Sequence, residues 1–124
     1  MTRSRALSIA LVATLCGCSE VRLREAMGIV QERYEDLQQK LEAGSNFASR
    51  DASIALERAL EAPEISKRSP FADDPEFERL LNSAIASTQE VRKVAQKFNR
   101  EALTGLRGQI TSQCDACHKV YRHR

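Results

Sequence analysis

Two cysteines and a histidine lie close together near the C-terminal end of the chain, at Cys114, Cys117 and His118. Thiols three positions apart on one helical turn can each form a thioether with one vinyl group of a porphyrin, and the imidazole that follows can then bind the iron. The pattern C-x-x-C-H is the attachment signal of a c-type haem. It predicts one covalent haem c with His118 as an axial ligand, and it requires the rest of the chain to wall a pocket.

The same residues allow two other kinds of site. Together with His123 they could form a Cys/His zinc site, but all four donors fall within ten residues of one predicted helix, which is poor geometry for a tetrahedron. A thioredoxin-like redox pair would need a βαβ pattern around the two cysteines, and the sequence predicts none. Haem attachment is therefore the preferred interpretation of the motif.

The composition favours helices over strands. The chain has 124 residues, which is the size of one small domain. Charged residues make up 29% of it and aromatic residues 5%, and there is no Trp. A β fold would contain more β-branched and aromatic residues, so we expect an all-α protein.

The first residues are typical of a targeting segment. Arg3 and Arg5 form a short basic start, and residues 6–15 are an apolar run too short to span a bilayer. The sequence L-C-G-C that follows resembles a bacterial lipobox, in which Cys18 is acylated and becomes the first mature residue. We therefore expect a lipoprotein signal peptide at 1–17 and a haem-binding domain at 18–124. Ordinary signal cleavage close to the same place is the alternative.

This processing would set the charge and the location of the protein. Without Arg3 and Arg5, 17 Lys and Arg residues balance 17 Asp and Glu residues, so no basic field indicates nucleic acid. Several acyl chains on Cys18 would anchor the protein stably to a membrane. Ser19 resembles the residue preferred in lipoproteins sorted to the outer membrane. The expected location is the periplasm, with a lipid anchor in the outer membrane.

Apolar residues at helical spacing predict four helices. The first covers 20–43 and ends at Gly44, a favourable C-cap residue. Ser45 or Asn46 would cap a second, Ala-rich helix over 47–62. The inward stripe of the first helix consists of Met27, Val30, Tyr34, Leu37 and Leu41.

The second half of the chain repeats this arrangement. After an expected loop over 63–73, Asp74 and Pro75 open a third helix, because Asp is a favoured N-cap and Pro suits the first helical position. Asn99 would cap a fourth helix over 100–121. Short connections between the paired helices predict an antiparallel up-down-up-down four-helix bundle.

The fourth helix carries the motif in its final turns. Its predicted inward face contains Leu103, Leu106, Ile110, Cys114 (or Gln113), Cys117 and Tyr121. Gly105 and Gly108 lower its helix propensity by about 1 kcal/mol each. We expect them to allow the close approach of a neighbouring helix or of the macrocycle.

Residues 114–122 read C-D-A-C-H-K-V-Y-R, which resembles the C-x-x-C-H-x-x-[YF]-R ending of the class II c-type cytochromes, the cytochrome c′ family and its low-spin relatives. In these four-helix proteins the haem is attached near the C-terminus of the last helix. The resemblance implies that Cys114 and Cys117 form the thioethers and that His118 is the proximal ligand. It also implies that Arg122 lies near the proximal face of the haem, with a solvated tail residue as the alternative.

The resemblance leaves the second axial position of the iron open. In cytochromes c′ this position is empty and the iron binds small gases, whereas in the low-spin relatives a Met from the first helix fills it. Met27 is the only Met of the predicted mature chain, and its soft thioether would raise the reduction potential. Alignment with the family instead puts Gly28 at the distal position, and Met27 could simply fill core space.

These features predict a periplasm-facing electron-transfer cytochrome with one haem c, axial ligands His118 and Met27, and redox proteins as partners. The alternative is a five-coordinate cytochrome c′ that binds nitric oxide, in which Met27 only lines the distal pocket. The sequence shows no grouping of Ser, His and acidic residues that would predict an enzyme. The resemblance allows a homodimer through the first two helices, which the apolar stripes do not require.

Overall fold

The computed structural model describes residues 2–97 and 99–122, with side chains from Cys18 onward. Within these residues every regular element is an α-helix and there is no strand, which confirms the all-α part of the predicted fold class. The helices are α1 (Thr2–Ala43), α2 (Asn46–Leu60), α3 (Pro63–Ser66), α4 (Pro75–Gln96) and α5 (Arg100–Tyr121).

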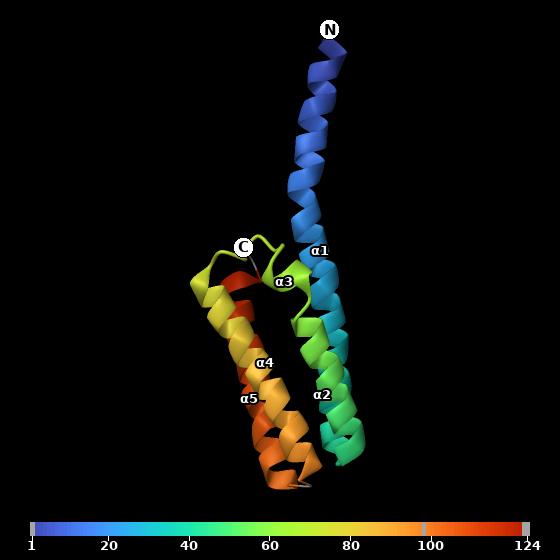
Figure 1. Cartoon of the computed structure of the whole chain (residues 1–124), viewed down its shortest axis with the longest axis vertical. Coiled ribbons are helices and arrows are strands. Elements are labelled where there is room, and N and C mark those ends of the chain that lie inside the picture. The colour runs from blue at the N-terminus through green and yellow to red at the C-terminus, as the bar shows by residue number, and fades with distance from the viewer. Residues whose placement is uncertain (1, 98, 123–124) are drawn as a thin grey trace.

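Two predicted boundaries were wrong. The first helix does not begin near residue 20, because α1 continues without a break through the expected leader, and Figure 1 shows its N-terminal part extending beyond the other helices. The expected loop over 63–73 contains the short helix α3, which buries Ile65 against the core. No helix in the described part of the chain is long and apolar enough to cross a membrane.

The predicted N-caps are confirmed. The Ser45 hydroxyl accepts a hydrogen bond of 3.4 Å from the backbone N–H of Ala48. Asp74 Oδ1 accepts bonds from the first N–H groups of α4, and Asn99 Oδ1 accepts one of 3.2 Å from Ala102. Each side chain satisfies backbone donors that a helix start leaves without an intrahelical partner, so local chemistry sets these boundaries.

Glycines have two different roles in the chain. Gly44 ends α1 with φ of 70°, a left-handed conformation that glycine adopts without steric cost. Figure 1 shows α2 returning alongside α1 after this turn. Gly105 and Gly108 are exposed, and a Cβ added to either would meet no atom within 4 Å. The expectation that they allow a neighbouring helix to approach closely was therefore wrong.

The long helices form two pairs that pack together. α1 lies along α2 and α4 lies along α5, while α2 packs against α4 (Figure 1). By contrast, α1 and α5 approach each other closely at few points. We call the line where they meet the seam. The largest fully buried apolar side chains come from all parts of the chain: Leu37, Leu56, Ile65, Val91 and Ile110.

A buried carboxylate joins the two pairs. Glu57 of α2 is only 9% exposed and accepts hydrogen bonds of 2.9 Å from Gln89 and 3.1 Å from Arg92, both on α4. These charge-assisted bonds compensate for removing the carboxylate from water. They fix α2 against α4.

Candidate functional site

The structure places the motif residues together in the last turns of α5. Cys114, Cys117 and His118 are half-buried, and both cysteines pack against the hydrophobic core. Asp115 and Lys119, which flank them, are exposed. The helix therefore turns the two thiols inward, as the apolar stripe predicted.

Burial also sets the protonation of these groups. Burial, assisted by Cys117 and Asp115, raises the pKa of the Cys114 thiol from its ordinary 9.0 to about 11. Burial likewise raises the pKa of Cys117. For His118, burial and then the charge of Arg122 lower the pKa. Near neutral pH the site consequently offers two protonated thiols and a neutral imidazole, the form that binds a metal.

Arg122 is exposed, and its backbone N–H bonds to the His118 carbonyl at 3.1 Å. Its positive charge acts on the imidazole of His118. The residue therefore lies beside the motif while remaining in contact with solvent.

Tyr121 follows the motif and is buried in an aromatic cluster. Its ring lies 5.0 Å from that of Phe71 and 5.2 Å from that of Phe77, measured between centroids. Its hydroxyl donates a hydrogen bond of 2.9 Å to Asp74. This packing ties the end of α5 to the start of α4 and restrains the helical turn that carries the motif.

Two linked hydrogen bonds at Thr111, about two helical turns before His118, connect α5 to α1 across the seam. The hydroxyls of Tyr34 on α1 and Thr111 on α5 lie 2.7 Å apart. Thr111 donates its only hydrogen to the carbonyl of Arg107 at 3.0 Å, so Tyr34 must be the donor to Thr111. The bond is partly buried, where it is stronger than it would be in water.

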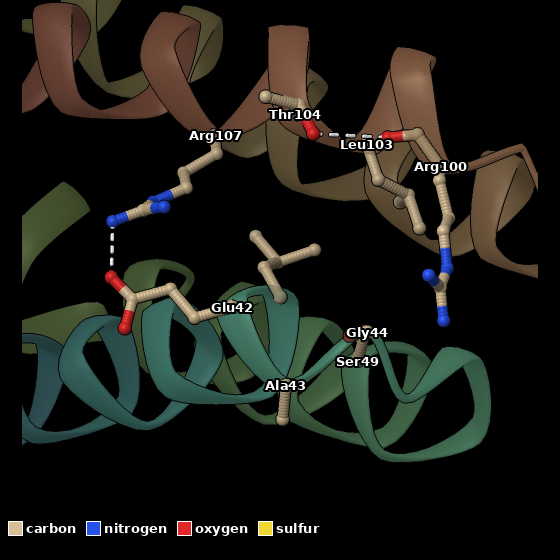
Figure 2. A pocket seen from close by; sticks show the side chains of 9 residues that line it. Glu42, Ala43, Gly44, Ser49, Arg100, Leu103, Thr104 and Arg107 are labelled. Carbon is tan, nitrogen blue, oxygen red and sulfur yellow. Dashed lines mark hydrogen bonds and ion pairs between the residues drawn. The ribbon is translucent and has the colours of Figure 1, made fainter.

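Arg107, one turn before Thr111 on α5, makes a second set of bonds to α1. Its Nε donates to Gln38 Oε1 at 2.6 Å, and its guanidinium also pairs with Glu42 (Figure 2). We name the five residues Tyr34, Gln38, Glu42, Arg107 and Thr111 the seam clasp. Sequence reasoning missed it, because polar partners 65 to 77 residues apart leave no local pattern.

The seam clasp fixes how α1 and α5 align. Tyr34 pairs with Thr111, and Gln38, four residues later, pairs with Arg107, four residues earlier, so the helices run in opposite directions in a defined register.

Extended two turns toward the C-terminus of α5, the same register brings Met27 level with His118. Seven residues separate Met27 from Tyr34, and seven separate Thr111 from His118. Seven residues are nearly two helical turns, so each residue shares the face of its helix that bears the bonded hydroxyl. Both lie about 10 Å beyond the Tyr34–Thr111 bond.

The surroundings of Met27 and Gly28 differ. Met27 is half-buried and packs against the core. Gly28 is exposed, and a Cβ added there would meet nothing within 4 Å. Of the two candidates for the position that faces His118, Met27 is therefore the one directed toward the interior.

The residues present fit a c-type haem by the chemistry of their donors. Two protonated thiols three residues apart lie beside a neutral imidazole on a half-buried face. Next to Cys114, the buried Oε1 of Gln113 has no hydrogen-bond partner among the described residues. A buried acceptor of this kind needs a donor, which a bound group or a water could supply.

Three of the four donors expected for the zinc alternative, Cys114, Cys117 and His118, lie in the described part of the chain. Among residues 2–97 and 99–122, no three His, Cys, Asp or Glu side chains are grouped so as to hold a metal ion. His123, its fourth expected donor, lies outside the described residues.

Comparisons of the chain with models of protein families, with curated proteins and with solved structures found no match. The assignment of a function consequently depends on the residues and their geometry. The resemblance to class II cytochromes is carried by residues 114–122 of the sequence.

Proposed function

We propose that this protein is an electron-transfer cytochrome of the class II type that carries one haem c. Cys114 and Cys117 would hold the haem through thioethers and His118 would bind the iron. The observation that carries the proposal is the inward, half-buried placement of these three residues at the end of the last long helix. When bound, the haem supplies one-electron chemistry between ferric and ferrous iron.

The bundle belongs to the same proposal. Tight reversals at Gly44 and Asn99 and the opposed register of α1 and α5 support an antiparallel up-down-up-down arrangement of α1, α2, α4 and α5. Such a bundle excludes water from groups held between its helices, and the exclusion of water tunes a reduction potential. The short α3 lies outside this four-helix plan.

Met27 is the proposed second axial ligand. It lies level with His118 on the opposing helix and is directed toward the interior, whereas Gly28 is exposed. A thioether is a soft ligand that favours ferrous iron and raises the potential, which suits an electron carrier. The proposed partners are redox proteins.

The location is also a proposal. We infer that residues 1–17 are a lipoprotein signal peptide and that Cys18 carries the lipid that tethers the protein to the outer membrane on its periplasmic side. The exposure of the Cys18 side chain on α1 supports this, since an acylated residue must be accessible. Two or more acyl chains would make the anchorage stable.

The second candidate is a five-coordinate cytochrome c′ that binds nitric oxide. The observation that favours it is the packing of Met27 against core side chains, because a Met in that place can serve as filling alone. Cys114, Cys117 and His118 would keep their roles. The two candidates differ only in whether the Met27 sulfur reaches the iron.

The experiment compares two variants in protein made by a host that attaches haem c. Haem staining on a denaturing gel should give a band, because only covalent haem survives; its absence would refute the proposal. A reduced spectrum should be low-spin in the wild type. Met27→Ala should become high-spin and bind carbon monoxide, while the neighbouring Gly28→Ala should leave the spectrum unchanged. High-spin iron already in the wild type would favour the second candidate.

A further inference from the structure

We infer that the seam clasp is a positioning device: Tyr34, Thr111 and Arg107 hold Met27 opposite His118 and thereby decide whether the iron has a sixth ligand. The inference rests on the proposed function. It assigns a role to three residues outside the motif, which lie about two to three helical turns away from His118 or Met27.

The clasp joins α1 and α5 through two sets of hydrogen bonds. The Tyr34 hydroxyl donates to Thr111, which donates to the carbonyl of Arg107, and the guanidinium of that arginine returns to α1 at Gln38 and Glu42. Figure 2 shows the last link, between Arg107 and Glu42. The two bonds that share the Thr111 hydroxyl polarise and strengthen each other, so the loss of one weakens the other.

The alignment of α1 with α5 has few other determinants. The two helices approach closely at few points, whereas α1 packs along α2 and α5 along α4. Apolar packing of this kind is non-directional and tolerates sliding, but hydrogen bonds need a defined distance and angle. The clasp is therefore the part of the seam that specifies a register.

An iron–sulfur bond is sensitive to that register. A slip of one residue moves a side chain about 1.5 Å along the axis and rotates its neighbour into place by about 100°. It would replace Met27 by Gly28, which has no side chain. A site must hold its ligands within about 0.5 Å of the productive geometry, so even a loosened clasp would lower the fraction of six-coordinate iron.

Thr111→Val tests the clasp with a matched control on the same helix. Thr104 makes the same bond to a backbone carbonyl four residues earlier, at 3.1 Å to Arg100, but it is exposed and has no bond across the seam. Thr104→Val therefore makes the same chemical change while the hydrogen bond between Tyr34 and Thr111 is kept. Tyr34→Phe and Arg107→Gln remove two further members, and Lys93→Gln removes an exposed ion pair of α4 as the control for charge.

The readouts are the spin state, the reduction potential and carbon monoxide binding of the haem-loaded protein. Thr111→Val, Tyr34→Phe and Arg107→Gln should each raise the ratio of high-spin to low-spin protein about fivefold, the factor that one hydrogen bond represents, and should lower the potential. Thr104→Val and Lys93→Gln should change neither. Haem attachment should remain complete in all five variants, because Cys114 and Cys117 are intact.

The outcomes separate the two levels of inference. If the wild type carries no covalent haem, the proposed function fails and the role of the clasp fails with it. If haem is attached and low-spin, but the three clasp variants match the wild type in spectrum and potential, the clasp inference is overturned and the proposed function stands. Thermal melting reports stability separately: a lower midpoint with an unchanged spectrum would assign the clasp a structural role only, which also overturns the inference.

Discussion

The hydroxyl of Tyr121 donates a hydrogen bond of 2.9 Å to the carboxylate of Asp74, 47 residues earlier in the chain. Asp74 is also the N-cap of α4, and its other oxygen accepts from Glu76 and Phe77. One carboxylate thus satisfies the start of α4 and holds the end of α5, three residues from His118. The residue that caps the start of α4 therefore also joins α4 to α5.

The two functions of Asp74 can be separated by mutation. Tyr121→Phe should cost about 1 kcal/mol of unfolding free energy, the net value of one hydrogen bond. Asp74→Ala should cost about 2–3 kcal/mol, because it also removes a cap worth about 1 kcal/mol. Urea unfolding measures both. In the double variant the Tyr121→Phe change should add little; full additivity would contradict a direct link between the two residues.

Two Gly→Ala substitutions should act in opposite directions. Gly44 has φ of 70°, and a Cβ there would lie 3.0 Å from the guanidinium of Arg100, so Gly44→Ala should destabilise the fold by at least about 1 kcal/mol. Gly105 is exposed within α5 with open space around it. Gly105→Ala should stabilise the fold by about 0.5–1 kcal/mol. Equal shifts in the thermal midpoint would refute the positive-φ explanation.

The haem-free protein should lose stability at alkaline pH through Cys114. The folded state keeps this thiol protonated up to a pKa of about 11, whereas the unfolded state ionises near 9.0. The unfolded state therefore releases its proton first, and stability falls as pH rises from about 9 to about 11. For a thiol that retains some exposure, the total loss of unfolding free energy is about 2 kcal/mol.

Urea titrations at pH 8 and pH 10.5 measure this loss, and Cys114→Ala provides the reference, because it removes only the titrating group. The variant should lose less stability over that interval than the parent. Haem-loaded protein should also lack the loss of stability that ionisation of Cys114 causes, since a thioether sulfur carries no proton. An identical slope in the variant and the parent would refute the assignment to Cys114.

Removing the buried carboxylate between α2 and α4 should be costly. Glu57→Ala breaks bonds to Gln89 and Arg92 that are partly screened from water, and we expect a loss of about 1–3 kcal/mol in urea unfolding. Glu76→Ala is the control, since its ion pair with Arg79 is exposed and should contribute little. Comparable losses in the two variants would show that burial of Glu57 is unimportant.

Much of the fold was predictable because its signals are local. Helical spacing identified the four long helices, and the side chains of Ser45, Asp74 and Asn99 marked three of their starts, since capping depends on residues a few positions apart. The helix Pro63–Ser66 was missed because four residues carry no periodicity, and burial of Ile65 against distant side chains stabilises it.

The candidate site divides in the same way. Cys114, Cys117 and His118 were predicted to lie together because they occupy adjacent turns of one helix. Which residue of α1 faces His118 could not be read from the sequence, since an offset of one position separates Met27 from Gly28. The pairing of Tyr34 with Thr111, which are 77 positions apart, is the contact that supports Met27 over Gly28.

That separation has a consequence for the order of folding. The bonds across the seam join residues 65 to 77 positions apart, whereas α1 with α2, and α4 with α5, meet through turns of a few residues. Closing a long loop costs more chain entropy than closing a short one, so the two hairpins should assemble first and the seam last. If Cys114 and Cys117 carry haem as we propose, the face of α5 that bears them would be open to an attachment enzyme while the hairpins are already helical, and closure of the seam would be the final step of maturation.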